Sequence, residues 1–410
     1  MGALVVALAL GACGSDSDDS GGGGGANGGG SDEPIVIGMA IANSGPIAPY
    51  DVEAGEAARL RAKQINADGG VNGRPLKMVV KDTRSDKATA SNAATELIGE
   101  GAVAIIASCD FDYGSPAAIA ANAAEVPGIS MCASDPQFAD KKTIGEYAFS
   151  MGVGSDVEGA SNAEWAFNEK DWKSVYILQD ESIEYTKALG RYFKARWEQL
   201  GGEVVGEDSF PGGENVNVRA QAARIRSEGG GADFIYLPSW NPGAATAIRQ
   251  LRAAGVDTPI LGPAAVDSSA LEKIAGPVSD VFFSPYACYV YCAGQDDPGL
   301  TEFADAFEAE YGKQPSSSYD LAAYNLVSAI ATAAENADEV TGPALKDQLE
   351  QLPEIETPTG EQQFFSPTCH KPIQPTLAYV EVVSGKLRYA GSYQVQEIAG
   401  VGDGNPCVSG

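Results

Sequence analysis

The sequence predicts an α/β protein with two lobes, each built on a doubly wound parallel sheet, and two observations support this. From Pro34 onward, short β-branched runs alternate with longer segments of helical spacing, and a second series of the same plan begins near Met151. Repeated alternation of strand and helix favours right-handed crossovers and parallel sheets. Because such sheets bind ligands beyond the carboxyl ends of their strands, we expect a ligand site there.

The first series contains four expected strands and three expected helices. The run "PIVIGMAI" is apolar without a break, which is typical of a buried strand, and the segment that follows it has helical spacing and ends in a Gly-Gly stop. The third helix is expected to follow Pro116. The strands are expected at 34–41, 76–82, 103–108 and 126–131, and the first two helices at 54–70 and 87–99, the latter behind the Ser85/Asp86 cap.

The second series opens with an expected helix over 158–167. Its strands are expected at 174–180, 202–208, 233–239 and 258–263, and its further helices at 184–200, 216–227 and 244–254. After a strand-like stretch over 279–287, helices at 300–311 and 319–334 precede a strand-like end at 376–395. We therefore expect a first lobe of residues 34–152 and 280–362 and a second lobe of residues 153–279 and 363–410, joined by several hinge strands.

The composition is that of a globular protein, with 44% hydrophobic and 20% charged residues in a chain of 410. The 56 Asp and Glu residues outnumber the 27 Lys and Arg residues and leave a formal net charge of −29. Such a surface repels phosphate backbones and anionic lipid heads, so we expect no nucleic-acid partner and no electrostatic docking on membranes. No run of about 18 apolar residues occurs, so no segment predicts a membrane-spanning helix.

The stretch "LGACGSD" contains Cys13, one of seven cysteines, and an odd number leaves one thiol without an intramolecular partner. The short apolar run before it ends in "LGAC", which resembles the lipobox of bacterial lipoproteins. This resemblance implies a signal peptide over 1–13 and a lipid anchor on Cys13. Residues 14–33 are rich in Gly, Ser and Asp and predict a flexible tether. No Lys or Arg precedes the apolar run, so we expect a basic segment upstream of it.

Six cysteines then remain to pair in an oxidising compartment. Proximity in the sequence favours the disulfides Cys109–Cys132, Cys288–Cys292 and Cys369–Cys407. The second pair carries a condition, because residues i and i+4 of an extended strand lie about 13 Å apart, beyond the roughly 7 Å limit for bridged Cα atoms. Either "CYVYC" turns or its cysteines pair elsewhere.

Several segments carry a family likeness. A Ser-Gly-Pro turn precedes Tyr50, an Ile-Asn-x-x-Gly-Gly-x-x-Gly turn follows, and "DESIEYTKALGRYF", "DFIYLPSWNPGAATAIRQLRAAG", "ILGP" and "EKIAG" come later in the chain. In their order and spacing they resemble the type I periplasmic binding proteins of ABC importers, in the leucine/isoleucine/valine-binding branch. The resemblance extends from Pro34 to about Tyr393. It implies capture of a small-molecule ligand between two lobes by hinge closure, and delivery to a cognate ABC permease.

The resemblance also implies which residues contact the ligand. In the first lobe, an aromatic side chain after the Ser-Gly-Pro turn shapes the pocket, and the loops "SCDFDYGSP" and "CASDP" offer N–H groups and hydroxyls, the former at a helix N-terminus. In the second lobe, two aromatic side chains close onto the ligand. The implied contacts are Tyr50, Asp110, Phe111, Ala133, Ser134, Tyr185, Trp240 and Asp267.

Two departures from the family pattern concern specificity. Asp110 stands where the family commonly has a small hydroxyl residue, and two anions near 4 Å repel by about 4 kcal/mol at an effective dielectric of 20. Ala264 stands where the family has an acid for the ligand's ammonium group, although Asp267 can substitute for it. We therefore expect a small polar ligand (an amino acid, amide, amine, urea-like or polyhydroxy compound) that is not a simple branched-chain amino acid.

Each implied contact also has a structural interpretation. Tyr and Trp side chains at strand ends often serve only in packing. Asp110 and Asp112 can act as caps of the helix that begins near Ser115, and Asp267 can act as the N-cap of "SSALEKIAG".

An enzyme is the alternative from another functional class. The only histidine is His370, and no GxSxG, Walker A or HExxH motif occurs. We therefore expect neither an enzyme, such as a hydrolase, nor a metal or cofactor. A second alternative is a sensor that signals to a membrane receptor, because hinge closure serves both roles. We expect a monomer that is held by its lipid anchor at the outer face of the cytoplasmic membrane.

The anchor hypothesis predicts the outcome of the substitution Cys13→Ser. Because the hydroxyl cannot accept the thioether-linked lipid, the variant should move from the membrane fraction to the soluble fraction when expressed in the native host. Cell fractionation followed by immunoblotting measures this. A Cys13→Ser protein that stays in the membrane fraction would contradict the anchor and leave the fold prediction untouched.

Overall fold

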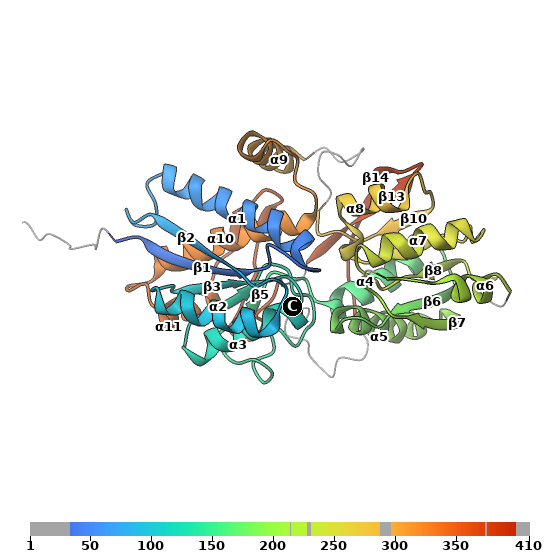
Figure 1. The fold of residues 1–410 in the computed structure, drawn as a ribbon, viewed down its shortest axis with the longest axis horizontal. Coiled ribbons are helices and arrows are strands. Elements are labelled where there is room, and N and C mark those ends of the chain that lie inside the picture. Colours follow the sequence, from blue (N-terminus) through green and yellow to red (C-terminus); the bar gives the residue numbers. More distant parts are fainter. Residues whose placement is uncertain (1–32, 214, 228–230, 288–296, 374, 399–410) are drawn as a thin grey trace, which may run out of the picture. The chain divides into compact units, whose positions relative to one another are not determined.

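The structure is a computed structural model that describes residues 33–213, 215–227, 231–287, 297–373 and 375–398 (Figure 1). The predicted signal peptide with Cys13 and nearly all of the predicted tether lie outside the described residues, as do Cys288, Cys292 and Cys407. Two sheets organise the described chain, and they confirm the predicted α/β fold with parallel-sheet lobes. No helix in the described ranges has the length and apolar character needed to cross a bilayer.

The first sheet has five parallel strands within the described chain, in the order β2-β1-β3-β4-β5. Successive side chains alternate between its faces: Ile37 and Ile41 pack toward α1 and α10, whereas Ala40 and Ile105 pack toward α2 and α3. Figure 1 shows the sheet between these helices. The elements are β1 (Ile35–Ile41), α1 (Ala48–Ala67), β2 (Leu76–Asp82), α2 (Lys87–Gly99), β3 (Ala104–Ala107), α3 (Phe111–Ala123), β4 (Gly128–Ser130), β5 (Ala148–Ser150) and α10 (Ser318–Asn336).

The second sheet has the order β14-β13-β10-β9-β8-β6-β7. Its strands run parallel from β7 to β10, and the C-terminal hairpin of β13 and β14 adds two antiparallel strands at one edge. Helices α4 and α5 cover one face, and α6, α7 and α8 cover the other. The elements are α4 (Ser155–Asn168), β6 (Ser174–Asp180), α5 (Glu184–Gln199), β7 (Glu203–Phe210), α6 (Arg219–Ser227), β8 (Phe234–Tyr236), α7 (Gly243–Ala253), β9 (Ile260–Gly262), α8 (Ser269–Ala275), β10 (Val281–Phe283), β13 (Thr376–Val383) and β14 (Lys386–Gln394).

Three more helices and a hairpin return to the first lobe: α9 (Pro298–Tyr311), α10, α11 (Gly342–Glu350) and the hairpin of β11 (Ile355–Thr357) and β12 (Gly360–Gln362). Two of the expected boundaries differ from this arrangement. Strand β10 lies in the second sheet, beside β9, so the chain leaves the second lobe after it rather than at residue 280. Phe365 packs on Phe149, and the carbonyl of His370 accepts a hydrogen bond from Ser150 N at 2.9 Å, so the first lobe extends beyond residue 362. We therefore propose that the lobes change between β10 and α9 and again between His370 and β13.

Most of the expected elements are present with bounds that differ by a few residues. The helix expected at 87–99 is α2, and its cap is confirmed because Asp86 Oδ1 accepts a hydrogen bond from Thr89 N at 2.8 Å. Strand β5, helix α11 and the β11–β12 hairpin were not expected. A three-residue strand such as β5 is too short to show a hydrophobic periodicity in the sequence.

The predicted disulfide between Cys109 and Cys132 is confirmed, with the two Cα atoms 4.8 Å apart. It joins the segments that follow β3 and β4, which are neighbours in the first sheet. Cys369 is disulfide-bonded as well, and its predicted partner Cys407 lies outside the described residues.

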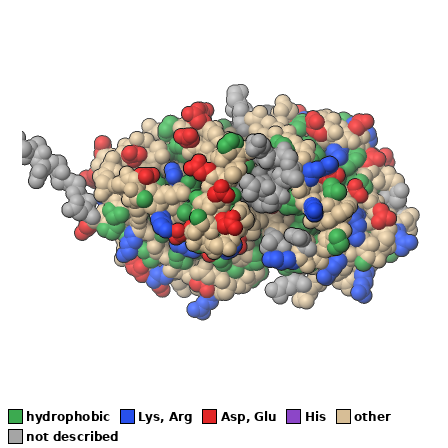
Figure 2. Space-filling view, turned by 90° about the horizontal axis from the view of Figure 1, so that it is seen from above, with side chains coloured by type: hydrophobic (Ala, Val, Ile, Leu, Met, Phe, Trp, Pro, Cys, Tyr) green, Lys and Arg blue, Asp and Glu red, His purple; other side chains and the backbone are tan. Residues whose placement is uncertain are grey.

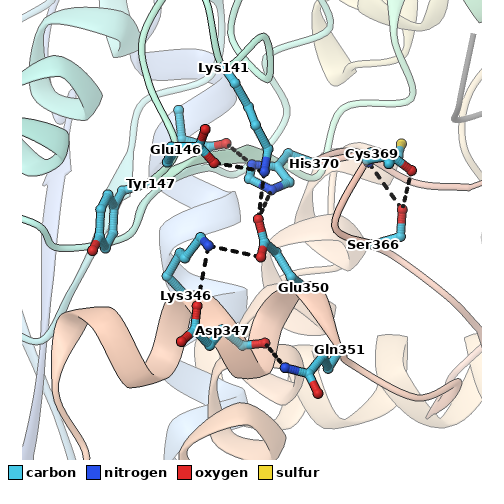
Figure 3. Close-up of polar contacts among 12 residues, drawn as sticks. Lys141, Glu146, Tyr147, Lys346, Asp347, Glu350, Gln351, Ser366, Cys369 and His370 are labelled. Atoms are coloured by element: carbon cyan, nitrogen blue, oxygen red, sulfur yellow. Dashed lines mark hydrogen bonds and ion pairs between the residues drawn. The ribbon is translucent and has the colours of Figure 1, made fainter.

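Charged side chains are spread over the surface, and Figure 2 shows acidic and basic side chains interspersed on one face of the molecule. Figure 3 shows one cluster in detail, in which the Glu350 carboxylate at the end of α11 is surrounded by donors. It accepts from Lys141 Nζ at 2.7 Å, and it lies 2.9 Å from both Lys346 Nζ and His370 Nε2. His370 Nδ1 lies 2.8 Å from the carbonyl oxygen of Ala148 in β5. The cluster thus joins α11, β5 and the segment that returns to the second lobe.

This cluster predicts an acid-sensitive contribution to stability. Burial raises the pKa of Glu350, but the hydrogen bonds from Lys141, Lys346 and His370 outweigh it and lower the pKa from 4.5 to about 2. A carboxylate with a depressed pKa stabilises the folded state above its unfolded pKa and loses that effect as the pH falls. The stability that this shift contributes at neutral pH is lost between about pH 4.5 and 2.

The substitution Glu350→Gln should therefore lower the free energy of unfolding at pH 7 and flatten its decline on acidification. Urea unfolding at pH values from 7 to 2.5 measures both effects. Asp347→Asn is the matched control, because its side chain is 61% exposed and it contacts only Lys346 in the cluster. Parallel pH profiles for wild type and Glu350→Gln would contradict the assignment.

Candidate functional site

A small cavity lies between the two lobes, where the strands of both sheets end. The first lobe contributes residues from α1, the segments after β3 and β4, and the start of α10, and the second lobe contributes residues that follow β6, β8 and β9. The lining consists of Ile47, Tyr50, Cys109, Asp110, Cys132, Ser134, Ile183, Tyr185, Trp240, Ala265 and Tyr319. Its volume is about 30 Å³, which is room for ordered water but not for a larger solute in this arrangement.

Five of the eight residues that the sequence implied as ligand contacts lie in this lining. They are Tyr50, Asp110, Ser134, Tyr185 and Trp240. The positions beyond the strand ends agree with the rule for parallel α/β sheets, under which ligands bind at that edge.

Tyr50 bridges the lobes from the first turn of α1. Its hydroxyl donates to the carbonyl oxygen of Ala265 at 2.9 Å and accepts from Asn241 N at 2.8 Å, and both partners belong to the second lobe. The ring lies 6.1 Å from the ring of Trp240 and 5.7 Å from that of Tyr319, between centroids. Tyr50 therefore both lines the cavity and holds its two walls together.

Asp110 is the N-cap of α3, and its Oδ1 accepts from Asp112 N at 2.8 Å. Its Oδ2 is buried and has no hydrogen-bond partner among the described residues. Burial, together with the nearby charge of Asp112, raises the pKa of Asp110 to about 8. The helix cap that the sequence offered as an alternative is thus present, and it uses only one of the two carboxylate oxygens.

Ser134 and Tyr185 reach the cavity from opposite lobes. The Ser134 hydroxyl lies 2.7 Å from the hydroxyl of Tyr286. Tyr185 donates to Glu158 Oε2 at 2.9 Å, while the other oxygen of Glu158 accepts from Ala264 N at 2.5 Å. Glu158, in the first turn of α4, is fully buried, and burial raises its pKa to about 7. Its carboxylate thus lies beside Ala264, the position where the family resemblance implied an acid.

Trp240 is held in place by a chain of hydrogen bonds within the second lobe. Its indole Nε1 donates to the Ser182 hydroxyl at 2.9 Å. Ser182 in turn donates to Asp180 Oδ1 at 2.6 Å, and Asp180 Oδ2 accepts from the Ser239 hydroxyl at 2.7 Å. The fully buried Asp180 at the end of β6 therefore orients the ring that closes one side of the cavity.

The structure places the other three implied contacts away from the cavity lining. Phe111 packs on the hydrophobic cluster beneath α2 and α3. Ala133 N donates to the Ser130 hydroxyl at 2.9 Å, so the N–H that was expected to meet a ligand is already used. Asp267 Oδ2 accepts from Ser318 N at 2.8 Å and joins the segment after β9 to the start of α10.

Sequence reasoning missed two residues that shape the site. Tyr319 lines the cavity at the start of α10, in a helix that returns from far along the chain, and only a three-dimensional contact brings it there. Glu158 lies inside an expected helix and carries no motif. Its complete burial is what singles it out, and burial of one acid cannot be read from a sequence so rich in acids.

Comparison with known proteins agrees with the fold described above. The family described as "Periplasmic binding protein" matches residues 34–386. The chain is 26% identical over 331 residues to the leucine-, isoleucine-, valine-, threonine- and alanine-binding protein of Pseudomonas aeruginosa, a match that covers 80% of this chain and 85% of the relative.

Two solved structures share the fold. The branched-chain amino acid transporter substrate-binding protein from Streptococcus pneumoniae, in complex with isoleucine, superimposes with a TM-score of 0.78 at 24% identity and covers 89% of this chain and 100% of its own. An ABC transporter solute-binding protein from R. palustris, in complex with benzoate, gives a TM-score of 0.73 at 20% identity and covers 89% and 98%.

The geometry predicts that the Tyr50 hydroxyl stabilises the closed arrangement of the lobes. In Tyr50→Phe the ring stays and both cross-lobe hydrogen bonds are lost, which should shift the balance toward an open form by about 1 kcal/mol. Small-angle X-ray scattering should show a larger radius of gyration without added solute. In the control Tyr185→Phe, whose hydroxyl bonds within the second lobe, the radius should match that of the wild type. Equal radii in all three proteins would contradict the bridging role.

Proposed function

Because the chain belongs to the periplasmic binding protein family, we propose that it is an extracytoplasmic solute-binding protein of an ABC importer. One observation supports this best: the cavity beyond the strand ends is walled by residues of both lobes, so a solute bound there would touch both and favour the closed form. Ligand-linked closure of this kind needs only that the solute bind one arrangement more tightly than the other.

The proposed ligand is a small polar solute. Relatives are named for branched-chain amino acids, and a structural neighbour holds benzoate, so the fold by itself does not fix the ligand. In this chain the side chain of Asp110 caps the N-terminus of α3, and its Oδ1 accepts from Asp112 N, so that N–H is not available to an amino acid's carboxylate. This supports a ligand other than a simple branched-chain amino acid.

We extend the proposal to the partners of the protein and to a role in binding rather than in catalysis. We propose that the lipid on Cys13 holds a monomer at the outer face of the cytoplasmic membrane, where it passes its solute to a cognate permease. The cavity lining supports binding rather than catalysis, because it contains no pairing of a nucleophile with a histidine. The single histidine, His370, lies instead in the cluster around Glu350 (Figure 3).

A thermal-shift screen over amino acids, amines, amides, ureas and polyols tests the proposal. A true ligand at about 100 times its Kd should stabilise the protein by about 2.7 kcal/mol. The same solute should reduce the radius of gyration of any open fraction, and Trp240→Ala should weaken its binding tenfold or more. Trp172→Phe is the control, because Trp172 packs on Phe234, on the face of the second sheet that α4 and α5 cover. No stabilisation by any solute in the screen would contradict the proposal.

A further inference from the structure

The unpartnered oxygen of Asp110 is the strongest unused feature of the cavity. Asp110 is 8% exposed and lines the cavity, and its Oδ2 has no hydrogen-bond partner in the part of the chain that the structure describes. A buried acceptor without a donor is costly, and a carboxylate more so than a neutral group. A solute that brings a donor to Oδ2 removes that cost, whereas a solute that brings another acceptor does not.

Aromatic rings form much of the remaining wall. Tyr50, Tyr185, Trp240 and Tyr319 all line the cavity. The ring of Tyr50 lies within about 6 Å of both Trp240 and Tyr319, so these three rings enclose one space. The faces of Trp and Tyr rings carry negative charge density and attract organic cations, most strongly where water is excluded.

The buried charge near the cavity has one sign. Asp110, Asp180 and Asp267 all raise the pKa of Tyr50 through their charges, after burial itself, and Glu158 does the same for Tyr185 and Tyr319. No Lys or Arg occurs among the described residues of the lining. Asp112, two residues after Asp110, pairs with Lys87 at 3.3 Å, and Lys87 is exposed. The local field therefore favours a positively charged solute and disfavours an anion.

We propose that the cavity takes a small organic cation without a carboxylate group, a protonated alkylamine or a guanidinium. One N–H donates to Asp110 Oδ2, and the charged group and its alkyl portion lie against the rings of Tyr50, Trp240 and Tyr319. This assignment rests on the proposed function and narrows its ligand class. The assignment also agrees with the cap of α3. Because Asp112 N already donates to Oδ1 of Asp110, that N–H is unavailable to a ligand carboxylate.

Four probes built on the 3-methylbutyl skeleton test the assignment by calorimetry. They are 3-methylbutylamine, leucine, which adds a carboxylate, 3-methylbutan-1-ol, which replaces the ammonium with a neutral hydroxyl, and 3-methylbutanamide, which replaces it with a neutral amide. We expect the amine to bind at least tenfold more tightly than any of the others. Tighter binding of leucine would overturn the proposal. Tighter binding of 3-methylbutanamide would also overturn it, because Asp110 would then act as a neutral donor instead of a charged acceptor.

The variant Asp110→Asn keeps the shape of the side chain and its ability to cap α3 while removing the charge. It should lower the affinity for 3-methylbutylamine at least tenfold and abolish the preference over the alcohol. Asp86→Asn is the matched control, because Asp86 caps α2 in the same way and does not line the cavity. Unchanged amine affinity in Asp110→Asn would overturn the proposal even if the protein bound the amine.

A pH profile gives an independent readout. Titratable groups near Asp110 come from four sides: Tyr50 of α1, Asp112 and Tyr113 of α3, Asp135 after β4 and Tyr185 of α5. Charged side chains act on Asp112 and Asp135 in turn, and they are Lys87 of α2 and Glu184, Lys187 and Arg191 of α5. Since burial raises the pKa of Asp110 to about 8, the free protein keeps a proton there that the cation displaces. The affinity for the amine should rise by up to about tenfold per pH unit from pH 6 to 8 and then level off, because the amine stays protonated to about pH 10. In Asp110→Asn the profile should be flat, and a flat profile in the wild type would overturn the proposal.

These results separate the two levels of the proposal. If leucine binds best and compacts the protein in solution, the solute-binding function stands and the cation assignment fails. If neither these probes nor the wider screen of solutes stabilises or compacts the protein, the solute-binding function fails as well.

Discussion

The carboxylate of Asp51 is the constraint on which the site depends. It is completely buried in the first turn of α1, and it accepts hydrogen bonds from Ala42 N at 2.7 Å and Cys109 N at 2.8 Å. These N–H groups belong to the residues just beyond β1 and β3, and buried backbone donors of this kind need partners. One carboxylate therefore fixes a helix against two strand ends. Burial raises the pKa of Asp51 to about 7 although both N–H donors favour the charged form, so part of the cost of burying that charge remains. Because Tyr50 precedes Asp51 and Asp110 follows Cys109, the same contact sets where the bridging hydroxyl and the cavity carboxylate lie.

Polar side chains reach the cavity from the first lobe, whereas aromatic rings reach it from both lobes. The first lobe contributes the carboxyl group of Asp110, the hydroxyl of Ser134 and the rings of Tyr50 and Tyr319, and the second contributes the rings of Tyr185 and Trp240. Asp110 holds its position at a backbone φ of 77°, a left-handed conformation that few residues other than glycine adopt. Local strain of this kind persists only where surrounding contacts impose it, and here the bond from Oδ1 to the N–H of Asp112 and the disulfide of Cys109 do so. The strain directs a carboxyl group with an unpaired oxygen into a cavity whose described lining contains no Lys or Arg, which is an arrangement suited to recognition and unfavourable for stability.

The sequence predicted the fold well because the fold depends on local patterns. The strand 174–180 and the helix 87–99 have in the structure the bounds that their apolar pattern and cap predicted, and the proximity of Cys109 to Cys132 predicted their disulfide. The site was only partly predictable, since a family resemblance gives positions along the chain but not the partners of each side chain. Asp267 illustrates this: its place three residues after Ala264 suggested that it substitutes for the family's acid, yet its carboxylate accepts a hydrogen bond from the N–H of Ser318, 51 residues later. Glu158 illustrates the reverse, because its importance comes from complete burial beside Ala264, a contact across 106 residues of sequence.

The closed arrangement has hydrogen bonds of its own, and this bears on how a solute acts. Tyr50 links the lobes through buried bonds, whereas Asp112 accepts from Glu184 N at 3.1 Å in a less buried place nearer the rim. Under the proposed function a solute enters when the lobes part, so the open fraction limits its rate of entry and not its equilibrium affinity. Stronger bridging by Tyr50 would therefore slow capture, and it would also stabilise the closed form that follows. The solute itself adds what the bridge cannot, a partner for the buried oxygen of Asp110. The unpaired oxygen of Asp110 thus sets which solute is preferred, whereas the hydrogen bonds of Tyr50 hold the lobes together. A substitution can change either property without changing the other.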